Sequence, residues 1–321
     1  MKGIAIAGNI LVDRINDISK YPTSGELTKI LAVRLATGGC VPNVAIDLVR
    51  LEPTLPVYAI GKVGRDGDGE FAVSVLRENG VNTDGVSCTD DRTSFTEVMS
   101  EVGGQRTFFT YPGASADFGF SDISFDKLDV RMLHLGYFLL LDKIDRGEGL
   151  EILKEATRRG IKTSIDLVSE NSDRYKLVIP CLEYTDNLIV NESEAGRLAQ
   201  MDPAEHSLSE IGERLLSLGV RERVIIHEPV RGVVVTREGV AELPSYELPR
   251  GFIKGTTGAG DAFSAGALLA IYEGRSDVEI LEYASLAALG ALREADAISG
   301  MATKEELRKI ANNLKRIEIC S

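Results

Sequence analysis

The segment LEILKEATRRGIKTSIDLV, residues 150–168, shows the pattern that decides the fold. An amphipathic stretch runs into a single glycine, and a β-branched run follows at once. The same pattern recurs in FAVSVLRENG (71–80), followed by Val81, and in LSEIGERLLSLGVRERVIIH (208–227). The glycine of each copy stands where the end of a helix favours a left-handed residue: Gly80, Gly160 and Gly219. Helix, glycine and strand in repetition are typical of βα units, so the sequence predicts an α/β fold with a mostly parallel sheet.

Two segments interrupt this pattern, residues 14–37 and residues 93–112. Both alternate in the way of β-strands, the second around a hairpin signal at Gly103-Gly104. We expect them to form a small antiparallel sheet inserted in a single α/β domain that spans residues 1–321. Beside an open parallel sheet, this small sheet is a candidate lid over a ligand site. An extra edge layer or a dimer contact would produce the same pattern.

The chain of 321 residues is acidic, with 36 lysines and arginines against 49 aspartates and glutamates and a net charge of −13. Because the sequence has no basic run, neither nucleic acid nor an anionic membrane surface is an expected partner. An anionic ligand must be held by local groups such as backbone N–H donors or a metal ion. Four cysteines, far apart in sequence, predict reduced thiols in the cytoplasm. With only three histidines, a histidine-rich zinc site is not expected, and no stretch approaches the roughly 20 apolar residues of a membrane span.

The stretch KGTTGAGDAFSAGALLAIYEG, residues 254–274, carries the strongest chemical signal. Small residues and glycines lead into an apolar helix, which we expect to begin near Ala262. A glycine-rich turn at a helix N-terminus offers unpaired N–H groups and the positive end of the helix dipole, so residues 258–260 are a candidate anion cradle. Asp261 lies in the mouth of this cradle, where phosphoryl transfer needs a proton acceptor for a hydroxyl nucleophile. The alternative is that Asp261 only caps the helix.

The motif NESE, residues 191–194, follows the apolar strand NLIV. Strand ends of an open parallel sheet are where ligands bind. Asn191 and Glu194 can share one side of a first helical turn and there hold a hydrated Mg²⁺ ion. A helix start in which the carboxylate complements the dipole would have the same sequence.

A third group of residues suits the binding of a sugar. In ATGGCVPN (36–43), Gly38 and Gly39 allow close backbone approach, and Asn43 offers both a donor and an acceptor. Asp13, shortly after the first strand, can accept hydrogen bonds from two neighbouring hydroxyls, although a turn or capping role is the alternative. The run DGDG (66–69) lacks the glycine position of an EF-hand, and we interpret it as a turn.

Five motifs in this order resemble those of the ribokinase-like, or phosphofructokinase B (pfkB), family of carbohydrate kinases. They are GNILVD (8–13), GGCVPN (38–43), GKVGRDGDG (61–69), NESE (191–194) and TTGAGD (256–261). The resemblance covers nearly the whole chain. It implies a three-layer α/β sandwich with a mostly parallel central sheet and a small β lid. It also implies that ATP, with Mg²⁺, phosphorylates a hydroxyl group of a small sugar or sugar acid.

The resemblance assigns a role to each matched residue. Asp261 would be the general base, and the anion hole for the transferred phosphoryl group would be Gly258, Ala259 and Gly260. The sugar pocket would be lined by Asp13, Gly38, Gly39 and Asn43, and the candidates from the lid are Arg106, Phe108 and Ala114. The nucleotide and its Mg²⁺ would be held by Asn191, Glu194 (through water to the metal), His227, Gly232 and Thr256. Dimers through the lid sheet occur in the family, so a homodimer is a further expectation.

Three departures from the family pattern bear on function. Gly255 stands where members usually carry an aspartate that helps to bind an activating monovalent cation, so potassium activation is expected to be weak or absent. HEPVRG (227–232) replaces the K-x-G-x-x-G pattern on the nucleotide side and keeps only Gly232. The mid-chain strand offers Gly136 instead of an acid, and Tyr137 is expected to face the pocket. A nucleoside kinase of the same family and a non-catalytic sugar-binding sensor stay open as alternatives.

Overall fold

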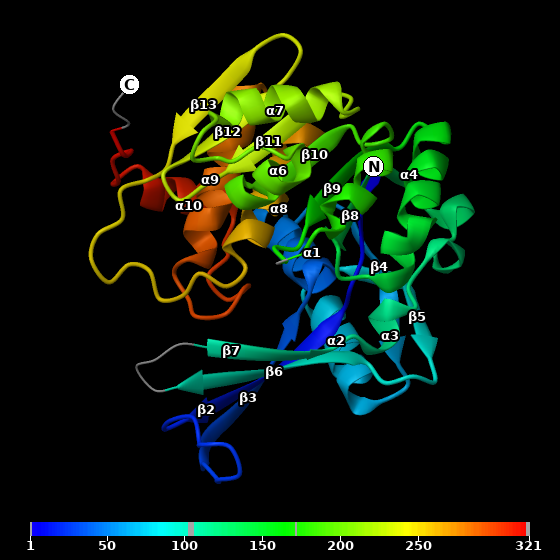
Figure 1. Ribbon diagram of the computed structural model, residues 1–321, viewed down its shortest axis with the longest axis vertical. Helices are drawn as coiled ribbons and strands as arrows, with labels where there is room; N and C mark the ends of the chain where they lie inside the picture. Colours follow the sequence, from blue (N-terminus) through cyan, green and yellow to red (C-terminus); the bar gives the residue numbers. More distant parts are fainter. Residues whose placement is uncertain (1, 102–105, 171, 319–321) are drawn as a thin grey trace.

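The computed structural model describes residues 2–101, 106–170 and 172–318, and within them the chain forms two sheets with helices around the larger one (Figure 1). The strands of the larger sheet are β1 (Gly3–Ala7), β4 (Val57–Gly64), β5 (Asn82–Thr89), β8 (Val130–Phe138), β9 (Lys162–Leu167), β10 (Asn187–Asn191), β11 (Arg223–His227), β12 (Arg231–Val235) and β13 (Val240–Pro244). Their order is β13-β12-β11-β10-β9-β8-β1-β4-β5. Neighbours pair in parallel except β11 with β12 and β12 with β13, which confirms the mostly parallel sheet.

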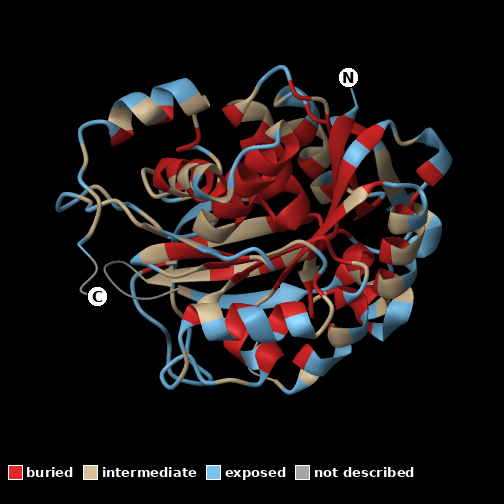
Figure 2. Cartoon of the chain, turned by 90° about the horizontal axis from the view of Figure 1, so that it is seen from above, coloured by how far each residue is buried: buried red, intermediate tan, exposed pale blue. Residues whose placement is uncertain are grey.

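Helices cover both faces of this sheet and make the fold three layers deep. On one face pack α1 (Cys40–Leu51), α2 (Gly67–Glu78), α8 (Ala259–Glu273), α9 (Asp277–Ala291) and α10 (Lys304–Ala311). On the other pack α4 (Gly149–Arg158), α5 (Ile179–Leu182), α6 (Glu192–Ala199) and α7 (Leu208–Ser217). Because successive side chains of a strand point to opposite faces, Ile4 and Ile6 enter the first layer and Ala5 and Ala7 the second. Figure 2 shows buried positions throughout the central strands and on the inner sides of the helices.

Shorter helical elements connect these layers. They are α3 (Gly113–Ala116) and single turns at Phe120–Asp122, Phe125–Lys127, Ile144–Glu148 and Arg174–Leu177. The run DGDG is not a turn, as interpreted from the sequence, but the start of α2. Asp66 is the N-cap, and its carboxylate accepts from the Gly69 N–H at 2.9 Å. Aspartate is a favoured N-cap, which is why these residues begin a helix.

The four-stranded sheet consists of β2 (Leu11–Ile18), β3 (Ile30–Gly38), β6 (Ser94–Glu101) and β7 (Arg106–Tyr111), in the order β3-β2-β6-β7. It lies beside the α/β body, at the bottom of Figure 1. The expectation of a wholly antiparallel sheet is wrong, because β2 and β6 run in parallel while each pairs with its own antiparallel neighbour. The expected hairpin signal at Gly103-Gly104 lies outside the described residues.

Two findings concern the environment of the chain. No helix in the described ranges has the length and apolar character needed to cross a membrane. Cys40, Cys88 and Cys181 are free thiols, and Cys320 is not among the described residues.

Candidate active site

The N-terminus of α8 lies at the centre of the site. The helix begins at Ala259, three residues before the expected Ala262, because Gly258 adopts a left-handed conformation (φ 77°) and its carbonyl already accepts the Ala262 N–H at 2.8 Å. The Ala259 N–H is directed to the Thr256 carbonyl at 3.3 Å. Gly258 has no side chain with which to cap the helix, so the next amides, those of Gly260 and Asp261, keep the donor capacity of a free helix end.

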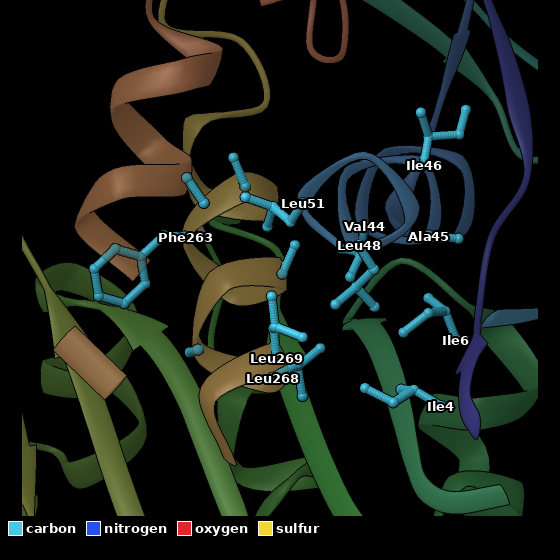
Figure 3. Close-up of a cluster of buried hydrophobic side chains, with 14 of the residues drawn as sticks. Ile4, Ile6, Val44, Ala45, Ile46, Leu48, Leu51, Phe263, Leu268 and Leu269 are labelled. Carbon is cyan, nitrogen blue, oxygen red and sulfur yellow. The ribbon is translucent and has the colours of Figure 1, made fainter. Parts of the chain in front are cut away.

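Asp261 is held by residues from two other elements. The packing of α1 against α8 brings Val44 and Leu48 into one cluster with Leu268 and Leu269 (Figure 3). This packing places Asn43, in the first turn of α1, beside Asp261. The Asn43 Nδ2 donates to Asp261 Oδ2 over 2.8 Å.

Tyr137, near the end of β8, makes the second contact. Its hydroxyl donates to the same oxygen of Asp261 over 3.0 Å. Its backbone is left-handed, with φ 61°, which is uncommon for a tyrosine. The Tyr137 N–H donates to Asp166 Oδ1, at the end of β9. The sequence analysis expects Tyr137 to face the pocket, but it does not identify Asp166, which lies in none of the five motifs.

Burial sets the protonation behaviour of Asp261. The side chain is buried, and this desolvation raises its pKa from 3.8 to about 7. The negative charges of Asp166 and Glu194 act in the same direction. The hydrogen bonds from Asn43 and Tyr137 favour the carboxylate and oppose the rise. A carboxyl group with a pKa near 7 is suited to accept and release a proton at neutral pH.

Asn191 and Glu194 form a reciprocal capping box at the start of α6. The Glu194 N–H donates to Asn191 Oδ1 over 2.9 Å, and the Asn191 N–H donates to Glu194 Oε2 over 3.0 Å. The helix-start interpretation of NESE is therefore correct, and a ligand role would come in addition to it. The other oxygen of Glu194 accepts from the Ser169 hydroxyl at 2.6 Å, a partner that sequence reasoning missed. Burial raises the pKa of Glu194 to about 7, so a nearby cation would stabilise its carboxylate form.

A cavity of about 510 Å³ opens between α6, the ends of β10 and β11, and the helices α8 and α9. Five predicted site residues line it: Asn191, His227, Thr256, Ala259 and Gly260. Its apolar wall consists of Tyr246, Leu248, Ile253, Phe263, Ala288, Leu289 and Leu292. Gly232 is not in the lining. A Cβ there would lie 2.9 Å from Leu281 and 3.4 Å from the Phe263 ring, so this glycine makes room for the wall.

His227 lies close both to Phe263 in the apolar wall of this cavity and to Gly260 at the start of α8. Its ring lies 4.7 Å from the ring of Phe263, and a Cβ on Gly260 would lie 3.8 Å from its Cε1. Burial lowers the pKa of His227 to about 4, so the imidazole is neutral at pH 7. It is therefore a hydrogen-bonding group without charge.

The residues predicted to bind a sugar gather between the four-stranded sheet and α1. A Cβ on Gly38 would lie 2.4 Å from Asp13 Oδ2, so only glycine lets this carboxylate lie against the backbone. Burial raises the pKa of Asp13 to about 6. Gly39 is left-handed (φ 92°), and a Cβ there would lie 2.8 Å from the Asn9 carbonyl.

The three candidates from the lid, Arg106, Phe108 and Ala114, have different surroundings. The Arg106 Nη1 donates to the Thr257 hydroxyl over 3.0 Å, which joins β7 to the loop before α8. Phe108 is exposed, whereas Ala114 is fully buried in α3. The structure thus brings Arg106 to the loop directly before the candidate anion cradle, whereas the side chain of Phe108 is exposed.

Two further features relate to metal ions. A Cβ on Gly255 would lie 2.9 Å from the Ala295 Cα and 3.0 Å from the Glu294 carbonyl, so an aspartate side chain has no room there. The ligand atoms of Cys40, His134 and Asp166 all lie within 4.8 Å of one another, a juxtaposition that the sequence spacing does not reveal. The two ring nitrogens of His134 are used by the Ser164 hydroxyl (2.9 Å) and by Asp166 Oδ2 (3.2 Å). Internal hydrogen bonds therefore occupy His134 and Asp166.

Comparison with known proteins places the chain. The model of the family described as "pfkB family carbohydrate kinase" matches residues 1–314. A ribokinase of Arabidopsis thaliana is 26% identical over 314 residues, which cover 96% of this chain and 80% of that protein. The structure of Arabidopsis thaliana ribokinase complexed with ribose and ATP superposes with a TM-score of 0.83 at 23% identity, covering 97% of this chain and 99% of that one. The nucleoside kinase of Methanocaldococcus jannaschii superposes with a TM-score of 0.77 at 18% identity, covering 96% and 97%. The chain therefore belongs to the pfkB family of carbohydrate kinases, the family that its five motifs predict.

Proposed function

We propose that this protein transfers the γ-phosphoryl group of ATP to a hydroxyl group of a small sugar or sugar acid, with Asp261 as the general base. One observation carries the proposal. A buried carboxylate with a pKa near 7 stands at a free helix N-terminus, between a large apolar cavity and the Asp13–Asn43 side of the site. A protein that only binds a sugar needs no such base beside an anion cradle. The relatives named as ribokinase and fructokinase support a sugar as the acceptor.

The nucleotide would occupy the cavity of about 510 Å³. Its apolar wall suits a flat base, and its Gly260 end suits phosphate oxygens. The buried carboxylate of Glu194, held by Ser169, fits a hydrated Mg²⁺ ion, because the cation would offset the charge that burial disfavours. When bound, ATP supplies the phosphoryl group, and Mg²⁺ reduces the negative charge on its oxygens.

The protein's own residues would do three things. Asp13, Gly38 and Gly39 would bind and orient the acceptor. The amides at the start of α8 would stabilise the negative charge of the transferring group. Asp261 would take the proton of the acceptor hydroxyl as it attacks, a contribution of the order of 10²–10⁴ in rate.

The four-stranded sheet would act as a lid over the acceptor. The hydrogen bond from Arg106 to Thr257 supports this proposal, because it ties the sheet to the loop that carries the anion cradle. Closure would exclude water and so protect the phosphoryl group from hydrolysis. The alternative roles of the sheet, an edge layer or a dimer contact, do not exclude a lid.

We also propose that the enzyme acts in the cytoplasm. Cys40 and Cys181 are buried free thiols and Cys88 is an exposed one, as expected of a reducing compartment.

The proposal is tested first with an ADP-release assay in the presence of Mg·ATP. The acceptors are ribose, fructose, tagatose, 2-keto-3-deoxygluconate, fructose 6-phosphate, adenosine and inosine. A strong response to one sugar or sugar acid is the expected result. A response to adenosine or inosine alone would show that the protein is a nucleoside kinase and not a sugar kinase. No response, together with a failure to bind ATP in calorimetry, would favour the sugar-binding sensor.

The role of Asp261 is tested with Asp261→Asn. We expect turnover to be abolished while the circular dichroism spectrum and sugar binding stay close to those of the wild type. The matched control is Asp277→Asn, because Asp277 also lies in the first turn of an apolar helix, α9, but its partner is Arg223 and not the site. If Asp261→Asn keeps more than a tenth of the wild-type rate, Asp261 is not the base.

A further inference from the structure

We propose that Tyr137 is a positioning residue for the catalytic base: its hydroxyl fixes one oxygen of Asp261 and so presents the other to the acceptor hydroxyl. This inference rests on the proposed function, in which Asp261 takes the proton. None of the five motifs includes Tyr137, and the aromatic side chain follows Gly136 at the end of β8.

The hydrogen bonds of Asp261 all fall on one side of its carboxylate. Asn43 Nδ2 and the Tyr137 hydroxyl both donate to Oδ2, over 2.8 Å and 3.0 Å. Within the described residues, no side chain donates to Oδ1. Two donors from different elements, α1 and β8, prevent the carboxylate from rotating, and the free oxygen then points in one direction. A fixed base is worth more than a rotating one, because proton transfer needs a narrow range of distance and angle.

The backbone around Tyr137 is itself constrained in two ways. Its left-handed backbone (φ 61°) is stabilised by the hydrogen bond from its N–H to Asp166. Asp166 is in turn bonded to His134, and His134 to Ser164, all of them buried. The backbone of Gly136 lies close to Cys40, since a Cβ on Gly136 would lie 1.9 Å from the thiol sulfur. Backbone strain that the surroundings enforce in this way is concentrated at functional sites, where it sets the direction of a side chain.

The contact also acts on the charge of Asp261. The titratable groups facing Asp261 are Asp166 from β9, Glu194 from α6, Cys40 and Asp47 from α1, and Tyr137 from β8. The acids among them disfavour the carboxylate form of Asp261, and the side chains that support it are the two neutral donors, Asn43 and Tyr137. Burial raises the pKa of Tyr137 well above 10, so its phenol stays protonated and remains a donor.

The decisive experiment compares Tyr137→Phe with the wild type and needs no substrate. The pKa of Asp261 is measured by ¹³C NMR on protein labelled at the aspartate carboxyl carbons, with the Asp261 signal assigned by its loss in Asp261→Asn. Removal of the phenol should raise this pKa by about 0.5–1 unit, because a donor to the carboxylate has been lost. The matched control is Tyr111→Phe. Tyr111 lies in β7 of the four-stranded sheet, and its hydroxyl is 3.4 Å from Asp91 in the loop between β5 and β6, so the substitution should leave the Asp261 signal unchanged.

The kinetic arm uses the acceptor that gives the highest rate in the ADP-release panel. For Tyr137→Phe we expect kcat to fall about tenfold, KM for ATP to stay within twofold, and the acidic limb of the kcat–pH profile to move upward with the pKa. A purely structural tyrosine would lower thermal stability without moving that limb. An unchanged pKa in Tyr137→Phe would overturn the inference.

A second variant covers a failure to fold, and the Asp261→Asn result separates this inference from the proposed function. If Tyr137→Phe does not fold, 3,5-difluorotyrosine at position 137 keeps the shape and strengthens the donor, so the pKa of Asp261 should fall; no change would again overturn the inference.

If Asp261→Asn is inactive and Tyr137→Phe behaves like Tyr111→Phe, only the role of Tyr137 fails. If Asp261→Asn stays active, the base assignment itself fails, whatever Tyr137 does.

Discussion

Three carboxyl groups of the site are held in the fold at the expense of stability. Burial raises the pKa of Asp13 to about 6 and the pKa values of Glu194 and Asp261 to about 7. For Asp261 the ordinary pKa is 3.8, so between pH 3.8 and about 7 the folded chain keeps a proton on this carboxyl group that the unfolded chain has lost. The stability that the protonated Asp261 contributes is complete below pH 3.8 and is lost as the pH rises through 7. The buried carboxyl group of Asp261 thus weakens the fold at neutral pH, where the proposed function needs it as a carboxylate.

This linkage predicts that Asp261→Asn stabilises the protein at pH 8. An amide cannot ionise, so the variant avoids a penalty that amounts at most to about 4 kcal/mol for a shift of about three pKa units. The gain in melting temperature should be largest at pH 8 and vanish near pH 4. Differential scanning calorimetry across this range is the measurement. Asp90→Asn, which removes an exposed carboxylate, should show no such pH dependence, and a lower melting temperature of Asp261→Asn at pH 8 would contradict the argument.

At the scale of the element, α8 begins and ends at a left-handed glycine. Gly258 has φ 77° and Gly274 has φ 73°. A Cβ on Gly258 would lie 2.4 Å from the Ala297 side chain, whereas a Cβ on Gly274 would have nothing within 4 Å. The two positions therefore share the backbone constraint and differ in packing.

We expect Gly274→Ala to cost about 1–2 kcal/mol in the free energy of unfolding, the penalty of a left-handed alanine, and to leave kcat unchanged. Gly258→Ala adds a clash with Ala297, which must displace the amides of the anion cradle. Its kcat should fall at least 100-fold. Urea unfolding and the ADP-release assay measure the two effects. Equal activity of the two variants would show that the cradle does not depend on the backbone at Gly258.

The helices and strands also show how far the sequence predicts the structure. The alternation of helices and strands and the glycines that end helices follow from periodicity and spacing, whereas the grouping of the motif residues into one site follows only from the resemblance to the family. The start of α8 was missed by three residues because alanine and glycine carry no cap signal. The parallel pairing of β2 with β6 depends on how two hairpins meet, and periodicity contains no such information. The Tyr137–Asp261 contact joins positions 124 residues apart, so only the tertiary fold brings it about.

At the scale of the whole molecule, the two faces of the four-stranded sheet differ. Strand register places Asp13 and Arg106 on the face toward the α/β body. The opposite face, that of Arg14, carries exposed apolar side chains on its outer strands: Val33, Leu35, Phe109 and Tyr111. Leu35 and Phe109 are 52% and 57% exposed and lie in one row across the sheet. Between them lie Arg14 and Glu97, so the exposed apolar side chains form the two outer edges of this face. Apolar side chains left exposed in this way in a single chain favour association.

We predict that this face joins two copies of the chain in solution. Because a twofold interface uses the same patch on both subunits, a charge on it is introduced twice and repels itself. Light scattering after gel filtration should give twice the chain mass of 34.7 kDa for the wild type and the single mass for Leu35→Glu. Leu27→Glu is the matched control, because Leu27 is 90% exposed in the β2–β3 loop, outside the sheet face, and should leave the dimer intact. A wild-type mass of 34.7 kDa at micromolar concentration would mean that the apolar face stays open and the sheet serves the active site alone.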